Sequence, residues 1–233
     1  MNTTVPSWSH SKLKDYDKCK HLFALKHLHK IPEPERVLRP GQTEFANDRG
    51  TRVHDNCEGY VRGDHDALCP EADKFFGPQI DLLRTMYQDG IVSMEGEWGH
   101  DKDWEPTEWK KAWLRLKLDV MVMIDPTHAI VIDYKTGKKR GNEISHAEQL
   151  QLYQLCAFLR YPKLEKVTAE LWYLDQNEVT SQTFTRQQGL RFRQGFDKRG
   201  ILATSCEVFP PNPNKYSCQW CPYKNTEHCT VGV

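Results

Sequence analysis

The chain has 233 residues, of which 38% are hydrophobic, which is enough to bury one substantial core. Its 32 basic and 32 acidic residues give a formal net charge of zero, so the composition excludes a strongly basic chain whose overall charge attracts nucleic acid. Apolar runs are too short to span a membrane, and the N-terminus lacks the apolar core of a signal peptide. We therefore expect a cytoplasmic protein of a bacterial, archaeal or phage-infected cell.

The first 90 residues are predicted to be mainly helical. Apolar residues recur at helical spacing in three segments, over residues 9–27, 43–62 and 71–89. Ser9 or Ser11 is expected to cap the first helix. A proline-rich stretch that starts at Ile31 separates the first two segments and predicts a loop.

The middle of the chain has the pattern of a mixed α/β fold. Strands are predicted over residues 91–99, 113–124, 129–134, 167–174 and 179–185, and helices over 143–161 and 185–202. The polar, Trp-rich tract 101–111 predicts a loop, and the turn residues 125–128 predict a hairpin of the second and third strands. This order predicts a central mixed β-sheet flanked by helices, in the α/β (α+β) class.

The end of the chain, residues 206–233, is irregular and cannot fold alone. It contains Cys218, Cys221 and Cys229 in a Cys-x₂-Cys-x₇-Cys pattern, and Cys19 lies in the first predicted helix. Without an export signal, eight cysteines are not expected to form a disulfide framework, and this distribution indicates a metal or cluster that staples the tail. The other four are expected to be free thiols: Cys57, Cys69, Cys156 and Cys206.

The residues most informative about function lie on the predicted hairpin. Side chains alternate along a strand, so Asp133 and Lys135 are expected on one side and Tyr134 on the other. Asp119 lies on the preceding strand, which returns antiparallel. Two carboxylates and an ammonium at a sheet edge suit metal-assisted phosphodiester cleavage, because carboxylates bind Mg²⁺ or Mn²⁺ and the lysine supports the attacking water or the developing charge. A solvated hairpin with a surface ion pair is the alternative interpretation.

Asp119 with Asp133-x-Lys135 resembles the core motif of the PD-(D/E)XK nuclease superfamily, and the predicted element order resembles its restriction-endonuclease-like core. The Gly-x-x-x-His motif that ends at His54 resembles that of RecB-like exonucleases. This resemblance implies that His54, Asp119, Asp133 and the backbone carbonyl of Tyr134 hold Mg²⁺ or Mn²⁺. It implies that Asp119, Asp133 and Lys135 are catalytic. Leucines stand where the family commonly has a glycine and a proline before Asp119, and neither change removes a ligand.

Further residues are expected to contact DNA or to complete the metal site. Gln149 and Tyr153 resemble the family's Gln-x-x-x-Tyr motif, which contacts DNA and the active site, with Gln151 as the alternative in a shifted register. The family often places an acid on the strand before that of Asp119, where Glu97 and Glu95 compete. The basic run is expected to engage phosphates, through Lys138, Lys139 and Arg140.

The cysteine pattern resembles the iron–sulfur variant of the RecB-like nucleases. The resemblance implies one [4Fe–4S] cluster on Cys19, Cys218, Cys221 and Cys229, which would clamp the N-terminal helix to the tail. A structural Zn²⁺ on the same thiolates is the main alternative, since the number of ligands cannot separate the two. His228 could replace one thiolate in a zinc site.

Together the resemblance implies a metal-dependent DNA exonuclease that acts on single-stranded ends, in recombination or repair or in CRISPR adaptation. Recombination or CRISPR integration proteins of a phage or its host are the partners expected. The chain would be one nuclease domain over 1–233, with a helical part (1–90), a core (91–205) and a Cys-rich tail (206–233) packed with Cys19. The alternatives are a non-catalytic DNA-binding or adaptor module with a structural iron–sulfur or zinc centre, and a redox-sensing iron–sulfur protein.

Overall fold

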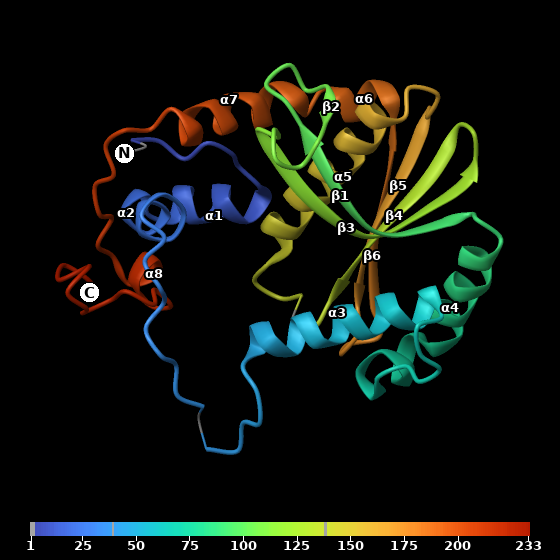
Figure 1. Cartoon of the computed structure of the whole chain (residues 1–233), viewed down its shortest axis with the longest axis horizontal. Coiled ribbons are helices and arrows are strands. Elements are labelled where there is room, and N and C mark those ends of the chain that lie inside the picture. The colour runs from blue at the N-terminus through green and yellow to red at the C-terminus, as the bar shows by residue number, and fades with distance from the viewer. Residues whose placement is uncertain (1–2, 39, 138) are drawn as a thin grey trace.

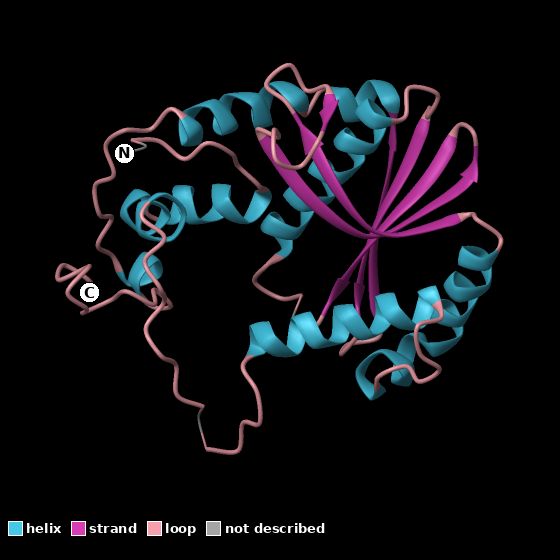
Figure 2. Ribbon diagram, in the orientation of Figure 1, coloured by secondary structure: helices cyan, strands magenta, loops and turns pink. Residues whose placement is uncertain are grey.

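The structure is a computed structural model, and it describes residues 3–38, 40–137 and 139–233, apart from the side chain of Glu95. A β-sheet forms its centre (Figure 2). The sheet has six strands in the order β2-β1-β3-β4-β5-β6. The strands are β1 (Val92–His100), β2 (Pro106–Thr107), β3 (Leu114–Asp125), β4 (His128–Lys135), β5 (Lys166–Tyr173) and β6 (Glu178–Thr185). Only the β4–β5 pair is parallel in this sheet. The prediction of a central mixed sheet flanked by helices is confirmed.

Helices cover both faces of the sheet (Figure 1). One face packs against α3 (Ala46–Arg62) and α4 (Pro70–Gln88) in an apolar cluster that includes Val53, Phe76 and Tyr134. The other face packs against α5 (Glu143–Arg160), whose apolar residues join those of β4 and β5 in a second cluster. Because parallel strands need a crossover, α5 connects β4 to β5 and thereby comes to lie over both.

The predicted β3–β4 hairpin is confirmed, and Asp125 stabilises its turn by accepting hydrogen bonds from the backbone N–H and the hydroxyl of Thr127, both at 2.7 Å. The predicted β5–β6 pair is also confirmed. Two details of this half were wrong. The expected loop 101–111 contains the two-residue strand β2, and the expected helix 185–202 is two helices, α6 (Arg186–Leu190) and α7 (Arg193–Thr204).

The prediction of one continuous helix over 9–27 was also wrong. Cys19 has an extended backbone (φ −164°, ψ 118°) and separates α1 (His10–Lys18) from α2 (Lys20–Phe23), which continues as the π-helical turn η1 (Ala24–Leu28). The side chains of Asn212 and Ser217 donate hydrogen bonds to the backbone carbonyl of Lys18, at 3.1 and 2.9 Å. The tail therefore satisfies a carbonyl at the break that a continuous helix would have satisfied itself.

The two ends of the chain lie side by side (Figure 1). Ser217 belongs to α8 (Lys215–Cys218), the short helix of the tail, and Tyr223 packs with Leu22 and Leu25 of the N-terminal helices in a small third apolar cluster. The hydroxyl of Tyr223 donates a hydrogen bond to the carbonyl of Ile31 at 2.6 Å. None of the helices in the described ranges is both long and apolar enough to cross a membrane.

Candidate active site

The candidate site lies where β3 and β4 diverge. The two strands pair from Asp125 and His128 to Val120 and Ile132, and the ladder ends there. Just beyond this point, the backbone N–H of Tyr134 donates a hydrogen bond to Oδ2 of Asp119 at 2.6 Å instead of to a backbone carbonyl of β3. The Asp119 carboxylate is therefore inserted between two separating strands and is held there by the backbone of β4.

Asp119 also contacts α3, because Nδ1 of His54 lies 3.1 Å from its Oδ1. Burial, and next the charge of Asp133, raise the pKa of the Asp119 carboxyl above its usual value. Burial alone would lower the pKa of His54, but the hydrogen bond and charge of Asp119 outweigh it and leave that pKa raised. The structure thus brings together His54, on a helix that covers one face of the sheet, and Asp119, on an interior strand of that sheet.

Asp133 lies on the α5 side of β4 and is 4% exposed. Its Oδ1 accepts hydrogen bonds from the Gln149 amide and the Tyr153 hydroxyl, each at 2.9 Å, and its carboxylate forms an ion pair with Lys135. Lys135 in turn donates a hydrogen bond to Oε1 of Gln149 at 2.9 Å. Burial raises the pKa of Tyr153 well above its usual value, so its hydroxyl keeps its proton as a donor. Asp119, Asp133, Lys135, Gln149 and Tyr153 are called the acid site below.

Alternation along β4 explains this separation of side chains. Asp133 and Lys135 face α5, whereas Tyr134 packs in the cluster beneath α3 and α4, where its ring meets that of His54 edge to face at 5.9 Å. Gln149 and Tyr153 lie one helical turn apart on the face of α5 that covers β4, and the Gln149 amide contacts the Tyr153 hydroxyl at 2.6 Å. Strand and helix periodicity together therefore assemble these contacts.

Other residues named from the sequence lie elsewhere. Glu97 is exposed and pairs with Lys117 at 3.3 Å, and Gln151 lines a different pocket, together with Phe192 and Arg199. Lys139 pairs with Glu178, at the start of β6, at 3.1 Å. Arg140 is exposed, and Lys138 lies outside the described residues, as does the side chain of Glu95. The strand neighbours of Glu95 pair with Leu118 and Val120.

The acid site has the donor chemistry of a divalent-cation site. Oδ2 of Asp133 is buried and is paired with the Lys135 ammonium, while burial and the charge of Asp133 disfavour the ionised form of Asp119. A hard cation between the two carboxylates would offset the repulsion that raises the pKa of Asp119. Within the described part of the chain, however, no three His, Cys, Asp or Glu side chains are gathered into one metal-binding group, and Nδ1 of His54 is engaged by Asp119. The ligands fit Mg²⁺ or Mn²⁺ by type, and binding would require His54 to exchange its partner.

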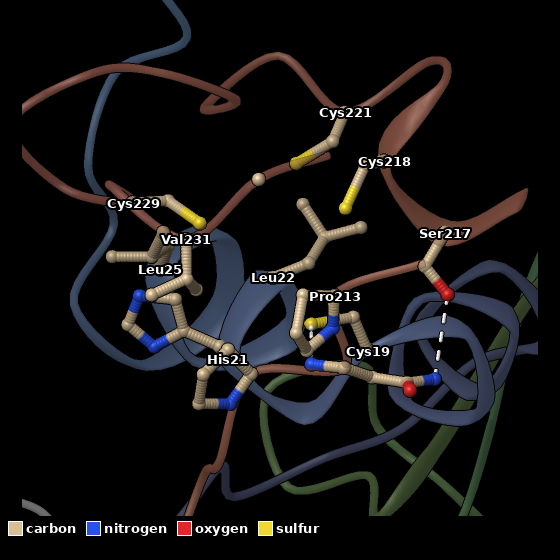
Figure 3. A pocket seen from close by; sticks show the side chains of 13 residues that line it. Cys19, His21, Leu22, Leu25, Pro213, Ser217, Cys218, Cys221, Cys229 and Val231 are labelled. Carbon is tan, nitrogen blue, oxygen red and sulfur yellow. Dashed lines mark hydrogen bonds between the residues drawn. The ribbon is translucent and has the colours of Figure 1, made fainter. Parts of the chain in front are cut away.

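Four cysteines from the two chain ends line one pocket, which we call the thiol pocket: Cys19, Cys218, Cys221 and Cys229 (Figure 3). All four are free thiols, and burial raises the pKa of Cys221. Leu22 and Leu25 form part of the wall, and His21 lines it too, whereas His228 does not. Four thiols fit an iron–sulfur cluster or Zn²⁺ by type, but they too are not gathered into one metal-binding group among the residues described.

Sequence reasoning missed a group of basic residues beside Lys135. His10 and Lys14 at the start of α1, Arg115 of β3 and His146 of α5 line a cavity together with Lys135. The only signal in the sequence was the abundance of lysine and histidine near the N-terminus. Nothing local to the sequence placed that segment against β3 and α5.

Comparison with known proteins identifies the class. A sequence model of the PD-(D/E)XK nuclease superfamily matches residues 7–226, almost the whole chain. The chain therefore belongs to the PD-(D/E)XK nuclease superfamily. Membership implies a hydrolase that acts on nucleic acids, and enzymes of this superfamily generally use Mg²⁺ or Mn²⁺.

Two other comparisons add little. One solved structure, described as "Crystal structure of SSO0001", is 16% identical, with a TM-score of 0.35 over 91% of this chain and 96% of that chain. That likeness is too distant to support an argument about function. No curated protein matches the chain significantly.

Proposed function

We propose that the chain is a metal-dependent DNA exonuclease that hydrolyses phosphodiester bonds from single-stranded ends. The observation that carries the proposal is the meeting of Asp119, Asp133 and Lys135 at the end of the β3–β4 ladder, in a chain of a nuclease superfamily. The resemblance of His54, Gln149 and Tyr153 to RecB-like motifs supports the exonuclease class, and all three contact the catalytic carboxylates.

The metal would be held by His54, Asp119, Asp133 and the backbone carbonyl of Tyr134. When bound, such an ion supplies an acidified water and neutralises charge on the phosphate. Lys135, which donates a hydrogen bond to Gln149, would orient the attacking water or balance the charge that develops on the phosphate. Gln149 and Tyr153, which donate hydrogen bonds to Asp133, would also position the DNA strand, and Lys139 and Arg140 would engage its phosphates.

The test is cleavage of single- and double-stranded DNA labelled at either end, with Mn²⁺, Mg²⁺ or EDTA, by the wild type, Lys135→Ala and the control Lys166→Ala. Lys166 is an exposed lysine of β5, so its loss should change nothing. We expect degradation of single strands that requires metal and fails in Lys135→Ala alone, and the label released first gives the polarity. Absence of cleavage by the folded wild type in every metal would refute the proposal and favour a binding module.

We propose further that the thiol pocket binds a [4Fe–4S] cluster, with Zn²⁺ as the alternative, so that the tail is fastened to α1 and α2. Support comes from the four free thiols around one pocket and the resemblance to iron–sulfur nucleases. Anaerobic purification followed by iron, sulfide and zinc analysis and an absorption spectrum separates the two. A role in recombination or in CRISPR adaptation, with proteins of those systems as partners, is proposed from the resemblance alone.

A further inference from the structure

A cavity of about 570 Å³ lies directly beside the acid site, and we call it the basic cavity. Its walls come from the start of α1, from β3 with the segment before it, and from α5. Lys135, Gln149 and Tyr153 belong to both the acid site and this cavity. Its volume is in the range of pockets that enclose a small organic ligand of about the size of a nucleotide. Whatever occupies it is therefore in reach of the catalytic lysine.

The charge of the basic cavity is one-sided. Among the described residues that line it, five carry a permanent positive charge and none is acidic: Lys12, Lys14, Arg115, Lys117 and Lys135. Lys117 is paired with Glu97 and Lys135 with Asp133, but no described carboxylate lies within ion-pair distance of the other three. Burial, with Lys14 and Lys135 adding to it, lowers the pKa of His10 to about 4, which is consistent with this excess of positive charge.

Arg115 and Trp109 place an aromatic ring beside this positive charge. The Arg115 guanidinium lies over the Trp109 ring at 5.4 Å from its centroid, and it donates a hydrogen bond to the carbonyl of Lys110 at 3.2 Å. Its Nε is buried without a hydrogen-bond partner among the described residues, and so is the hydroxyl of Ser145 across the cavity. Unused donors beside an aromatic ring are the groups that bind a phosphate and a base in single-stranded nucleic acid.

The position of the cavity is fixed by the fold. Trp8, just before α1, bridges to Leu114 in parallel, with the Trp8 N–H bonded to the Trp113 carbonyl at 2.7 Å and the Arg115 N–H bonded to the Trp8 carbonyl at 2.9 Å. This bridge holds the start of α1 against β3. Lys12 is fixed in addition, because its ammonium donates hydrogen bonds to the carbonyl and the hydroxyl of Ser7 at 2.9 and 3.1 Å. The cations are thus presented by a pre-formed wall.

We propose that the basic cavity binds the nucleotide that adjoins the scissile phosphate of the single strand, with its phosphate on Arg115 and Lys14 and its base against Trp109. The proposal rests on the proposed function and deepens it. It places the nucleotide beside Lys135, against the wall formed by α1, β3 and α5, and leaves Lys139, which pairs with Glu178, for phosphates further along the DNA strand. A nucleic-acid strand satisfies both features of the cavity at once, because every nucleotide carries an anion and a π-face.

The first test is binding rather than cleavage. Fluorescent single-stranded DNA is titrated in EDTA with the wild type, Arg115→Ala, Lys14→Ala and the control Lys111→Ala, and anisotropy is read at several salt concentrations. Lys111 is 73% exposed, pairs with Glu108 and does not line the cavity. We expect Arg115→Ala to bind about tenfold more weakly, and the slope of log affinity against log salt concentration to be smaller by about 1. Lys14→Ala should lose less affinity. If Arg115→Ala and Lys14→Ala bind like Lys111→Ala, the proposal is wrong.

The second test locates the base. A series of oligonucleotides with one abasic position each is bound by the wild type and by Trp109→Ala. We expect one position at which loss of the base weakens binding by the wild type about tenfold. At that position the loss should leave the affinity of Trp109→Ala unchanged. An abasic penalty that persists at every position in Trp109→Ala would overturn the stacking role. Lys14 is exposed, so its variant remains informative even if Trp109→Ala or Arg115→Ala fails to fold.

The two proposals can fail separately. Normal DNA binding that depends on Arg115, without any cleavage in Mg²⁺ or Mn²⁺, would defeat the exonuclease and leave the basic cavity standing. Metal-dependent cleavage, with DNA binding that does not depend on Arg115, Lys14 or Trp109, would support the exonuclease and defeat the proposal for the basic cavity.

Discussion

The acid site and the thiol pocket both gather side chains from distant parts of the chain, yet they are organised differently. In the acid site, Asp119 and Asp133 accept hydrogen bonds from a backbone N–H, an amide and a hydroxyl, and Lys135 is held by Gln149. In the thiol pocket, the thiols are held by backbone groups of the tail: the N–H of Asn212 donates to Sγ of Cys19 at 3.4 Å, and the backbone of Tyr223 forms a hydrogen bond with the Cys221 thiol.

The two regions therefore differ in how far their structure depends on a bound metal or cluster. The acid site is built on the central sheet and α5, so its geometry is present before any ion binds. The thiol pocket is built on a tail whose apolar contacts with the rest of the chain are mainly those of Tyr223 with Leu22 and Leu25 and of Phe209 with Phe23. We therefore expect loss of a metal to abolish chemistry at the first region and to loosen structure at the second.

The largest expected effect is on chemistry. Asp119→Ala should lower metal-dependent cleavage by about 10³-fold or more, because a ligand and its charge are lost together, while the fold is kept. Single-turnover cleavage of a labelled strand measures this, with circular dichroism as the check on folding. Asp125→Ala, at the exposed hairpin turn, is the matched control and should retain activity. Full activity of Asp119→Ala would remove Asp119 from the site.

The next effect separates the two regions. Cys221→Ser should lose the bound iron or zinc and make residues 206–233 sensitive to protease, while the core resists as in the wild type. Limited proteolysis with mass spectrometry, together with metal analysis, gives both readouts. Cys206→Ser is the control, because Cys206 lies in the tail but outside the thiol pocket. Equal protease sensitivity of both variants would show that no bound centre orders the tail.

A smaller effect concerns stability at the acid site. Asp119→Asn should raise the melting temperature in EDTA by roughly 2–4 °C, for about 1 kcal/mol, because it removes a buried charge near Asp133 and keeps an oxygen for the Tyr134 N–H. The raised pKa of Asp119 means that the folded state holds its proton more readily, so wild-type stability falls as pH rises above about 3.9 towards the folded value. The difference in melting temperature between Asp119→Asn and the wild type should grow over that pH interval and then level off. A melting temperature below the wild type at neutral pH would contradict this explanation.

The sequence sufficed where the governing interactions are local. Strand alternation correctly separated Asp133 and Lys135 from Tyr134, and helical spacing correctly put Gln149 and Tyr153 on one face. The central sheet and its hairpins followed from apolar periodicity and turn residues in the same way. Each of these features is decided within a dozen or so neighbouring residues.

Features set by distant contacts were not predictable. The helix break at Cys19 depends on Asn212 and Ser217, which reach the Lys18 carbonyl from the other end of the chain. The basic cavity depends on the β-bridge between Trp8 and Leu114, which the apolar periodicity of the sequence does not predict. In both cases the local sequence favours one structure and a tertiary hydrogen bond selects another.

The smallest effect tests whether the N-terminal helices hold together without the thiol pocket. Asp15 of α1 accepts a hydrogen bond from His27 of η1 at 2.9 Å and lies 3.5 Å from the Lys26 ammonium. Burial alone would raise the pKa of Asp15, but His27 and Lys26 outweigh it and leave that pKa lowered. The group therefore adds stability above its unfolded pKa of about 3.9 and loses it as pH falls through the lower folded value.

Asp15→Asn should accordingly cost about 1 kcal/mol of the free energy of unfolding at pH 7, and the cost should shrink below about pH 4. Urea denaturation of both proteins across this range measures the difference. Asp17→Asn in the same helix is the control, because Asp17 is exposed and its pair with Arg199 should contribute less. If the cost of Asp15→Asn is also seen in the Cys221→Ser background, α1 and η1 are joined independently of any bound centre. If the cost of Asp15→Asn vanishes in that background, the bound metal or cluster positions both α1 and η1. The whole N-terminal part, and not only the tail, would then depend on the thiol pocket for its structure.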